Sequence, residues 1–135
     1  MSEDVRIEEA RMCFACGTEN PIGLGIRFAL DDEGRCHGDF MPTENHVGYQ
    51  NTVHGGIIFA ALDDVMANVL YLNNRKAHTA RCEVRYRRAL EVGQAIHLTG
   101  WVEAERRRMI TMRGEARLTE GGDVVADCEA RFMLV

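Results

Sequence analysis

The sequence predicts one α+β domain in which an antiparallel sheet of about six strands wraps around one long central helix. The second half of the 135-residue chain alternates apolar and polar residues with a period of two, which is typical of half-buried strands. The first half contains one long apolar segment, Ile57–Leu72. A sheet with one apolar face needs a cover, and this segment is the only helix available to provide it.

The elements of the first half follow from turn signals. Residues 1–23 form an irregular segment of the single 1–135 domain and carry a Cys-x-x-Cys-Gly motif. Leu24–Leu30 and Arg35–Met41 are predicted strands, joined through an Asp-Asp-Glu-Gly turn. Pro42–Val53 is an irregular loop that ends at His54.

The helix and the later strands follow from length and periodicity. Ile57–Leu72 is too long for a typical strand and is rich in Ala, Leu and Met, and Asn73-Asn74 ends it. Four consecutive strands with short links then require antiparallel pairing. Their apolar faces are predicted to collect Ala80, Cys82, Val84 and Tyr86, then Ile96, Leu98, Gly100 and Val102, then Ile110, Met112, Gly114, Ala116 and Leu118, then Val124, Ala126, Cys128, Ala130, Phe132 and Leu134.

Composition excludes several classes of function. The chain is 46% apolar and 27% charged, with a net charge of −5, which argues against general binding to nucleic acid or membrane surfaces. The acidic N-terminus, Met1–Arg11, lacks the apolar stretch of a signal peptide, and Ile57–Leu72 is too short and too polar for a membrane span. Five cysteines, two of them on apolar-face positions, indicate a reducing, cytoplasmic compartment.

The start of the predicted helix holds the candidate site. His54-Gly55-Gly56 leaves backbone N–H groups open at a helix N-terminus, which favours negative charge, and Asp63 and Asp64 lie farther along the same apolar segment. Nine residues at about 1.5 Å rise separate His54 from Asp63 by roughly 13 Å. If both ends serve one reaction, a second copy of the helix must supply one of them, which predicts a dimer.

This order of elements, with His54-Gly55-Gly56 at the helix start and Asp63 nine residues later, resembles the hot-dog fold acyl-CoA thioesterases. The nearest branch is the phenylacetate-pathway (PaaI-like) type, whose bacterial members share the opening Cys13-Phe14-Ala15-Cys16-Gly17 followed by Asn20-Pro21 and Gly23-Leu24. The resemblance covers essentially the whole chain. It implies homodimers, or dimers of dimers, with two thioester sites at each dimer interface.

The resemblance also assigns roles to residues. The Gly55 N–H would polarise the thioester carbonyl, Asp63 of the neighbouring subunit would act as general base or nucleophile, Thr79 would position the attacking water, and His54 would orient the loop and substrate. Family members often carry Asn six residues before the histidine, where this chain has Gly48. Asn51 or Asn45 is a candidate substitute for it. The expected substrate-binding residues are Gly56, Asn51, Arg85, Arg87 and Arg88.

Each candidate has a structural alternative. Asp64, about 100° around the helix from Asp63, is the better candidate for a solvent-facing or structural carboxylate. His54 is alternatively a loop histidine bonded to backbone, and the arginines 85, 87, 88 and 106–108 are either a phosphate patch or a solvated sheet face. Cys13 and Cys16 have metal-ligand spacing, but only Cys36 and His37 offer a completing pair.

The expected function is hydrolysis of acyl-CoA thioesters to the free acid and coenzyme A, without a metal or redox cofactor. Two alternatives remain open. One is an enoyl-thioester hydratase of the same fold, and the other is an acyl-CoA-binding protein that does not hydrolyse its ligand. Neither nucleic acid nor membrane is an expected partner.

Overall fold

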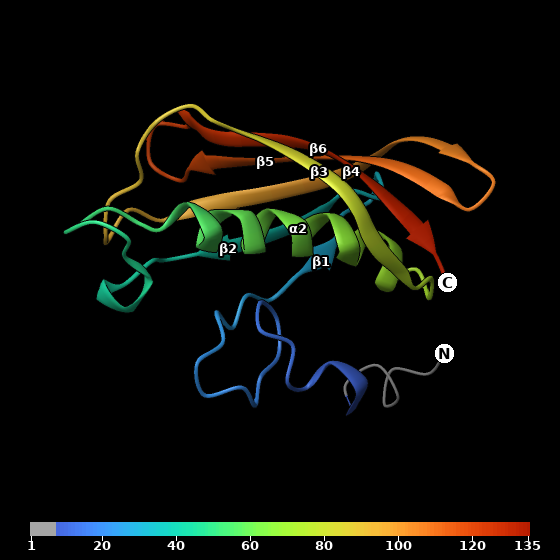
Figure 1. Ribbon diagram of the computed structural model, residues 1–135, viewed down its shortest axis with the longest axis horizontal. Coiled ribbons are helices and arrows are strands. Elements are labelled where there is room, and N and C mark those ends of the chain that lie inside the picture. Colours follow the sequence, from blue (N-terminus) through green and yellow to red (C-terminus); the bar gives the residue numbers. More distant parts are fainter. Residues whose placement is uncertain (1–7) are drawn as a thin grey trace.

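The computed structural model describes residues 8–135. Its sheet has the order β1-β2-β4-β5-β6-β3 with every neighbouring pair antiparallel, and α2 lies along one face of it (Figure 1). The predicted α+β fold with about six strands around one long helix is confirmed. The elements are β1 (Ala29–Leu30), β2 (Cys36–Phe40), the 3₁₀ turn η1 (Glu44–His46), α2 (Gly55–Tyr71), β3 (Ala77–Tyr86), β4 (Ile96–Arg106), β5 (Met109–Leu118) and β6 (Val124–Leu134).

Helix α2 is held close to the sheet by glycines in the two central strands. A Cβ at Gly100 of β4 would lie 2.8 Å from the Val65 carbonyl oxygen, and one at Gly114 of β5 would lie 3.2 Å from the Met66 side chain. Side chains larger than hydrogen at these places would therefore push the helix away. The buried residues of α2 are Ile58, Ala61, Leu62, Val65, Met66, Asn68, Val69 and Leu70.

The period-two alternation predicts most of the inner face of β4, β5 and β6. It is wrong at Val102, which is 39% exposed where the pairing of β4 with β5 shifts, and it misses Val125, which is fully buried where the pairing of β5 with β6 shifts. Ile96, Leu98, Ile110, Met112 and Phe132 are fully buried between sheet and helix. Strand β1 is much shorter than the predicted Leu24–Leu30 strand. The reason is that the N–H groups of residues 24 and 26 bond to the carbonyls of residues 14 and 15, in the N-terminal segment, rather than to β2.

Strand β3 departs from regular alternation. Its pairing with β6 shifts between Thr79 and Arg81, so Ala80 is an extra, bulged residue. The bulge turns Thr79 toward α2, whereas alternation through the whole strand predicts Ala80 on that face. Cys82 and Val84 pack against the core as predicted.

The N-terminal segment, residues 8–28, lies on the side of α2 opposite the sheet (Figure 1). Ala15 and Ile26 are its buried anchors, at 5% and 2% exposure. Helix α2 is therefore enclosed between the sheet and this segment over part of its length. No helix among residues 8–135 is long and apolar enough to cross a membrane.

Candidate active site

His54 caps α2. The ring Nδ1 of His54 accepts a hydrogen bond from the Gly56 N–H at 2.8 Å. The backbone N–H of His54 donates to the His46 carbonyl oxygen. A Cβ at Gly56 would lie 3.0 Å from His54 Nδ1, so glycine leaves room for the cap. The Gly56 N–H is therefore already committed to His54. Gly55, one residue earlier, has an N–H with no acceptor among residues 8–135, as expected at the first position of a helix.

Tyr86, at the end of β3, fixes the start of the helix from the sheet side. Its hydroxyl donates to the Gly55 carbonyl oxygen at 2.8 Å. A Cβ at Gly55 would lie 3.4 Å from the Tyr86 ring, so the ring contacts the turn directly. The sequence pattern placed Tyr86 on the helix-facing side of its strand, but nothing in the pattern indicated this bond.

Asp63 meets Thr79 across the gap between α2 and β3. The Thr79 hydroxyl donates to Asp63 Oδ1 at 2.6 Å. Burial raises the pKa of Asp63, and the Thr79 hydrogen bond opposes this by stabilising the carboxylate. The pair combines a partly desolvated carboxylate with a hydroxyl, and such a pair is able to hold and deprotonate a water molecule.

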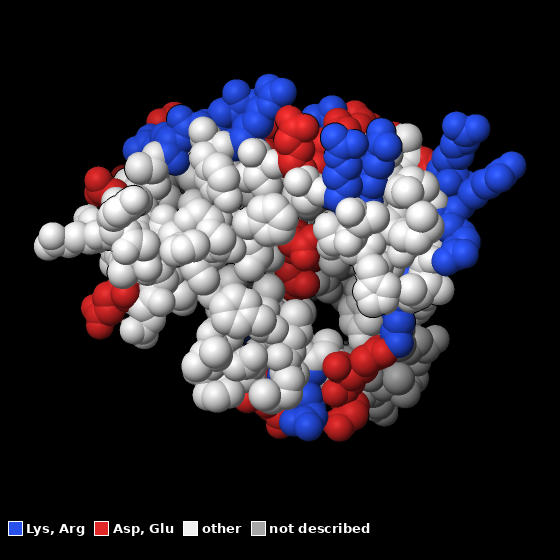
Figure 2. All heavy atoms as spheres, viewed as in Figure 1, with Lys and Arg blue, Asp and Glu red and all other residues white. Residues whose placement is uncertain are grey.

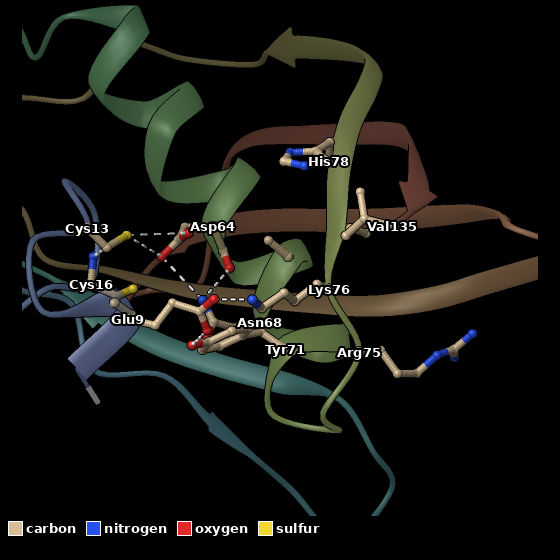
Figure 3. Close-up of a pocket in the computed structure, with 13 residues that line it drawn as sticks. Glu9, Cys13, Cys16, Asp64, Asn68, Tyr71, Arg75, Lys76, His78 and Val135 are labelled. Atoms are coloured by element: carbon tan, nitrogen blue, oxygen red, sulfur yellow. Dashed lines mark hydrogen bonds and ion pairs between the residues drawn. The ribbon is translucent and has the colours of Figure 1, made fainter. Parts of the chain in front are cut away.

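Asp64 points away from Asp63, toward the N-terminal segment. Its two carboxylate oxygens lie 3.9 and 3.8 Å from the Cys13 sulfur (Figure 3). Asn68, one turn later, donates to Asp64 Oδ2 at 3.2 Å. Burial, with the nearby Cys13, raises the pKa of Asp64 to about 7. Its solvent-facing alternative is therefore wrong, and Asp64 belongs to an internal contact.

The two cysteines of the N-terminal motif have contrasting environments. Hydrogen bonds from the Cys16 thiol and from backbone N–H groups lower the pKa of Cys13 to about 5. The same interaction and burial raise the pKa of Cys16. Cys36 and His37 do not complete a metal set with this pair, because they are neighbours on β2 that face opposite sides of the sheet: Cys36 is fully buried, and His37 bonds Asp31.

The loop before the helix holds Asn51, an expected substrate-binding residue, together with Gly48 and Asn45. Asn51 is exposed in a turn with a positive φ of 61°, and its carbonyl accepts from Val92. Gly48 lies beside the His54 ring. A Cβ at position 48 would be 3.4 Å from Cδ2 of that ring. An asparagine at position 48 would therefore contact His54. Asn45 instead forms part of η1, where its N–H bonds the Thr43 hydroxyl.

The three arginines expected to meet phosphate groups are exposed and paired with carboxylates. Arg87 bonds Asp127 at 2.7 Å, Arg88 bonds Asp123 at 2.9 Å, and Arg85 lies 3.8 Å from Glu83. Figure 2 shows basic side chains gathered along the sheet side of the molecule, with acidic groups among them. A phosphate bound here would compete with these carboxylates.

Comparisons of fold place the chain among several solved structures. RHA08564, a thioesterase superfamily protein, matches with a TM-score of 0.82 and 26% identity over 88% of this chain, which spans only 61% of that protein. The Escherichia coli PaaI protein of the phenylacetic acid degradation operon matches with a TM-score of 0.81 and 18% identity, over 97% of this chain and 96% of that one. A hypothetical thioesterase of Streptococcus pneumoniae, solved with coenzyme A, matches with a TM-score of 0.75 and 15% identity, over 82% and 85%.

Sequence comparison identifies the family. No curated protein matches the chain at a significant level. The family model of the thioesterase superfamily, however, matches residues 50–125, which run from the loop before His54 into β6 and so include Gly55, Asp63 and Thr79. The resemblance to hot-dog thioesterases is thus confirmed, and the chain belongs to the thioesterase superfamily.

Proposed function

We propose that the protein hydrolyses acyl-CoA thioesters to a free acid and coenzyme A. The observation that carries the proposal is the Asp63–Thr79 hydrogen bond, which joins a partly buried carboxylate to a hydroxyl in a chain of the thioesterase superfamily. Two structural neighbours were solved with coenzyme A or acetyl-CoA, and they support this class of ligand.

In the proposed reaction Asp63 acts as general base on a water held by Thr79, or attacks the carbonyl itself to form a mixed anhydride that water then hydrolyses to the free acid and regenerated Asp63. The Gly55 N–H stabilises the oxyanion, the C–S bond breaks, and the thiolate of coenzyme A leaves and takes up a proton. His54 holds the turn by capping the helix. The S. pneumoniae neighbour supports the pair: it was also solved with an aspartate, and with a threonine 16 residues later, each replaced by alanine, and 16 residues also separate Asp63 from Thr79.

The site is proposed to be shared between two subunits. Gly55 and Asp63 lie about two turns apart on one helix, at roughly 1.5 Å per residue, too far for one carbonyl to meet both. Strand β3 ends the sheet order and its residues are mostly exposed, which leaves an edge for a second copy to extend. In such a dimer, Asp63 of one subunit would face Gly55 of the other, and a dimer of dimers would use the same interface.

Coenzyme A is proposed to lie along the dimer surface. Its phosphates would be met by Arg85, Arg87 and Arg88, in competition with their carboxylate partners. The loop that holds Asn51 and the helix start at Gly56 would border the acyl end.

The test is a panel of short, long and aromatic acyl-CoA esters with thiol release as the readout and mass spectrometry of the products. Release of free acid supports hydrolysis. Hydration of an enoyl-CoA, or saturable binding of acyl-CoA with no turnover of any ester, would overturn the proposal in favour of a hydratase or a binding protein. Light scattering of the same preparation tests the dimer, and a monodisperse monomer would contradict the shared site.

A further inference from the structure

Cys13, Cys16 and Asp64 form a cluster that the proposed hydrolysis does not use. The cysteines come from the N-terminal segment and Asp64 from the middle of α2, and one potential ligand atom of each lies within 4.8 Å of the others. Figure 3 shows both sulfurs and the carboxylate converging from the two sides. Cys13 and Asp64 are 51 positions apart in sequence, so the fold alone brings the cysteines and the carboxylate together.

The turn that carries the cysteines already has the shape of a metal-binding loop. The Gly17 N–H donates to the Cys13 carbonyl at 2.8 Å, and the Cys16 N–H donates to the Cys13 sulfur at 3.4 Å. A Cβ at Gly17 would lie 2.5 Å from the Arg11 carbonyl oxygen and the Cys13 nitrogen, so only glycine fits the turn. Backbone N–H groups directed at a sulfur favour the thiolate, which is the form that binds metals.

The charge balance of the cluster favours a cation. Among residues 8–135, no lysine, arginine or histidine pairs with Asp64 or either cysteine. The two basic side chains of the adjacent cavity are occupied elsewhere, Lys76 by Glu9 and Arg75 by Glu105. A carboxylate and two thiols are thus gathered without a positive partner, which is unfavourable unless a cation or protons compensate.

We propose that Cys13, Cys16 and Asp64 bind one zinc ion that fastens the N-terminal segment to α2. Zinc accepts thiolate at about 2.3 Å and carboxylate at about 2.0–2.2 Å in a tetrahedron, which places ligand atoms roughly 3.5–3.8 Å apart. The Cys13–Asp64 distances of 3.9 and 3.8 Å already approach that spacing. The mixed sulfur and oxygen set selects zinc over magnesium or calcium, which take oxygen ligands alone.

Asn68 prepares the carboxylate for this role. Its side-chain amide donates to Asp64 Oδ2 and to the Asp64 backbone carbonyl, at 3.2 and 2.9 Å. This leaves Oδ1 to the ion and fixes the orientation of the group, as partners of metal ligands do. Three protein ligands leave one position for water, and the cluster opens on a cavity of about 310 Å³ that Asn68 and His78 also line.

Metal content tests the proposal without reference to hydrolysis. The full chain is purified under reducing conditions without chelator, and zinc is measured by plasma mass spectrometry. We expect close to one zinc per chain in the wild type and in Cys82→Ser, a control that removes a cysteine outside the cluster. Cys13→Ser, Cys16→Ser and Asp64→Asn should each lose most of it. An Asp64→Asn chain that keeps full stoichiometry would refute the carboxylate ligand.

A second measurement needs no variant and therefore does not depend on variant folding. The reduced, metal-free wild-type chain is titrated with Co²⁺ and then with zinc. Thiolate-to-cobalt charge-transfer absorption that saturates at one equivalent and disappears on adding zinc supports the site. Absence of binding by the reduced chain, or isolation of the protein with a Cys13–Cys16 disulfide that persists in zinc-containing buffer, would overturn it.

Discussion

The Thr79 hydroxyl lies 2.6 Å from Asp63 Oδ1 and donates to it, which joins β3 to the middle of α2. On the same helix the next residue, Asp64, turns toward the N-terminal segment and contacts Cys13. Two adjacent carboxylates therefore make contacts on two different sides of one helix, Asp63 with β3 and Asp64 with the N-terminal segment. This division allows each to be removed separately.

Asp63→Asn should abolish hydrolysis, with a fall in kcat of roughly 100-fold or more, because the amide is nearly isosteric but cannot act as base or nucleophile. Asp64→Asn is the matched control and should retain most of the turnover per folded molecule. Steady-state kinetics, with circular dichroism to verify folding, makes the comparison. The reverse order of effects would show that Asp64 is the reactive carboxylate.

Thr79→Ala should lower kcat by roughly 10- to 100-fold, as expected when a hydrogen bond of about 1.5–3 kcal/mol to a charged group is lost. KM should change little, because the hydroxyl faces Asp63 and the water rather than the body of the substrate. Thr79→Ser keeps the hydroxyl and should stay within a few-fold of wild type. Equal losses in the alanine and serine variants would argue against a role for the hydroxyl.

A mixture of two inactive variants tests the shared site. Gly55→Pro removes the oxyanion N–H at a helix position that tolerates proline, and Asp63→Asn removes the carboxylate. Random re-pairing gives about half heterodimers, each with one intact site of two, so activity should recover to about a quarter of wild type. If well-folded mixed dimers recover no activity, the Gly55 N–H and the Asp63 carboxylate do not act together in one shared site.

Removal of the proposed zinc ion by a chelator should lower the thermal stability of the protein without lowering its rate of hydrolysis. Hydrolysis measured well below the melting temperature should be unchanged per folded molecule, because Asp63, Thr79 and the Gly55 N–H need no metal. Loss of a ligand present at about 100 times its Kd costs about 2.7 kcal/mol, so Tm should fall by several degrees. Differential scanning calorimetry and the thioester assay on the same sample provide both readings. Loss of activity with no change in Tm would indicate a catalytic metal instead.

Asp31 predicts a specific dependence of stability on pH. The hydrogen bond from His37, at 2.7 Å, and two backbone N–H groups hold the pKa of Asp31 below its ordinary 3.8. A carboxylate whose folded pKa is lowered stabilises the fold above its unfolded pKa and loses that effect as the pH falls through the folded value. The Tm advantage of wild type over Asp31→Asn should therefore be complete well above pH 3.8, begin to decline near that pH, and disappear once the pH falls below the lower, folded pKa. An advantage that grows on acidification would contradict this assignment.

The spacing of apolar residues along the chain predicts most of the helix and strands, because that spacing reflects which side of each element is buried. The predicted helix over residues 57–72 is observed as Gly55–Tyr71, and the alternating faces of the last three strands are as expected except at Val102, which is exposed, and Val125, which is buried. The strand predicted at residues 24–30 is mostly wrong, since its backbone bonds to the N-terminal segment. No local sequence pattern indicates that the backbone of this stretch bonds to an irregular segment about ten residues earlier in the chain.

The site was less accessible to sequence reasoning. The residue pattern indicated Gly55 and Asp63, and the family resemblance added Thr79, but the contact between Asp63 and Thr79 depends on a bulge that has no sequence signal. The contact between Cys13 and Asp64 depends on how the N-terminal segment crosses the helix. Both are tertiary effects, and neither follows from the residue types.

The bulge at Ala80 also determines how insertions and deletions would act on this strand. Removing Ala80 would restore unbroken pairing between β3 and β6, and by backbone criteria the strand would be improved. Thr79 would keep its partner Phe132 and its side toward α2, because Thr79, Arg81 and Cys82 would then alternate regularly along the strand. A relative with a one-residue gap at Ala80 would therefore keep both the fold and the contact between Thr79 and Asp63. A relative of the same length that pairs the residue at position 80 regularly with β6 would instead turn its threonine away from the helix, so strand length and bulge have to be read together.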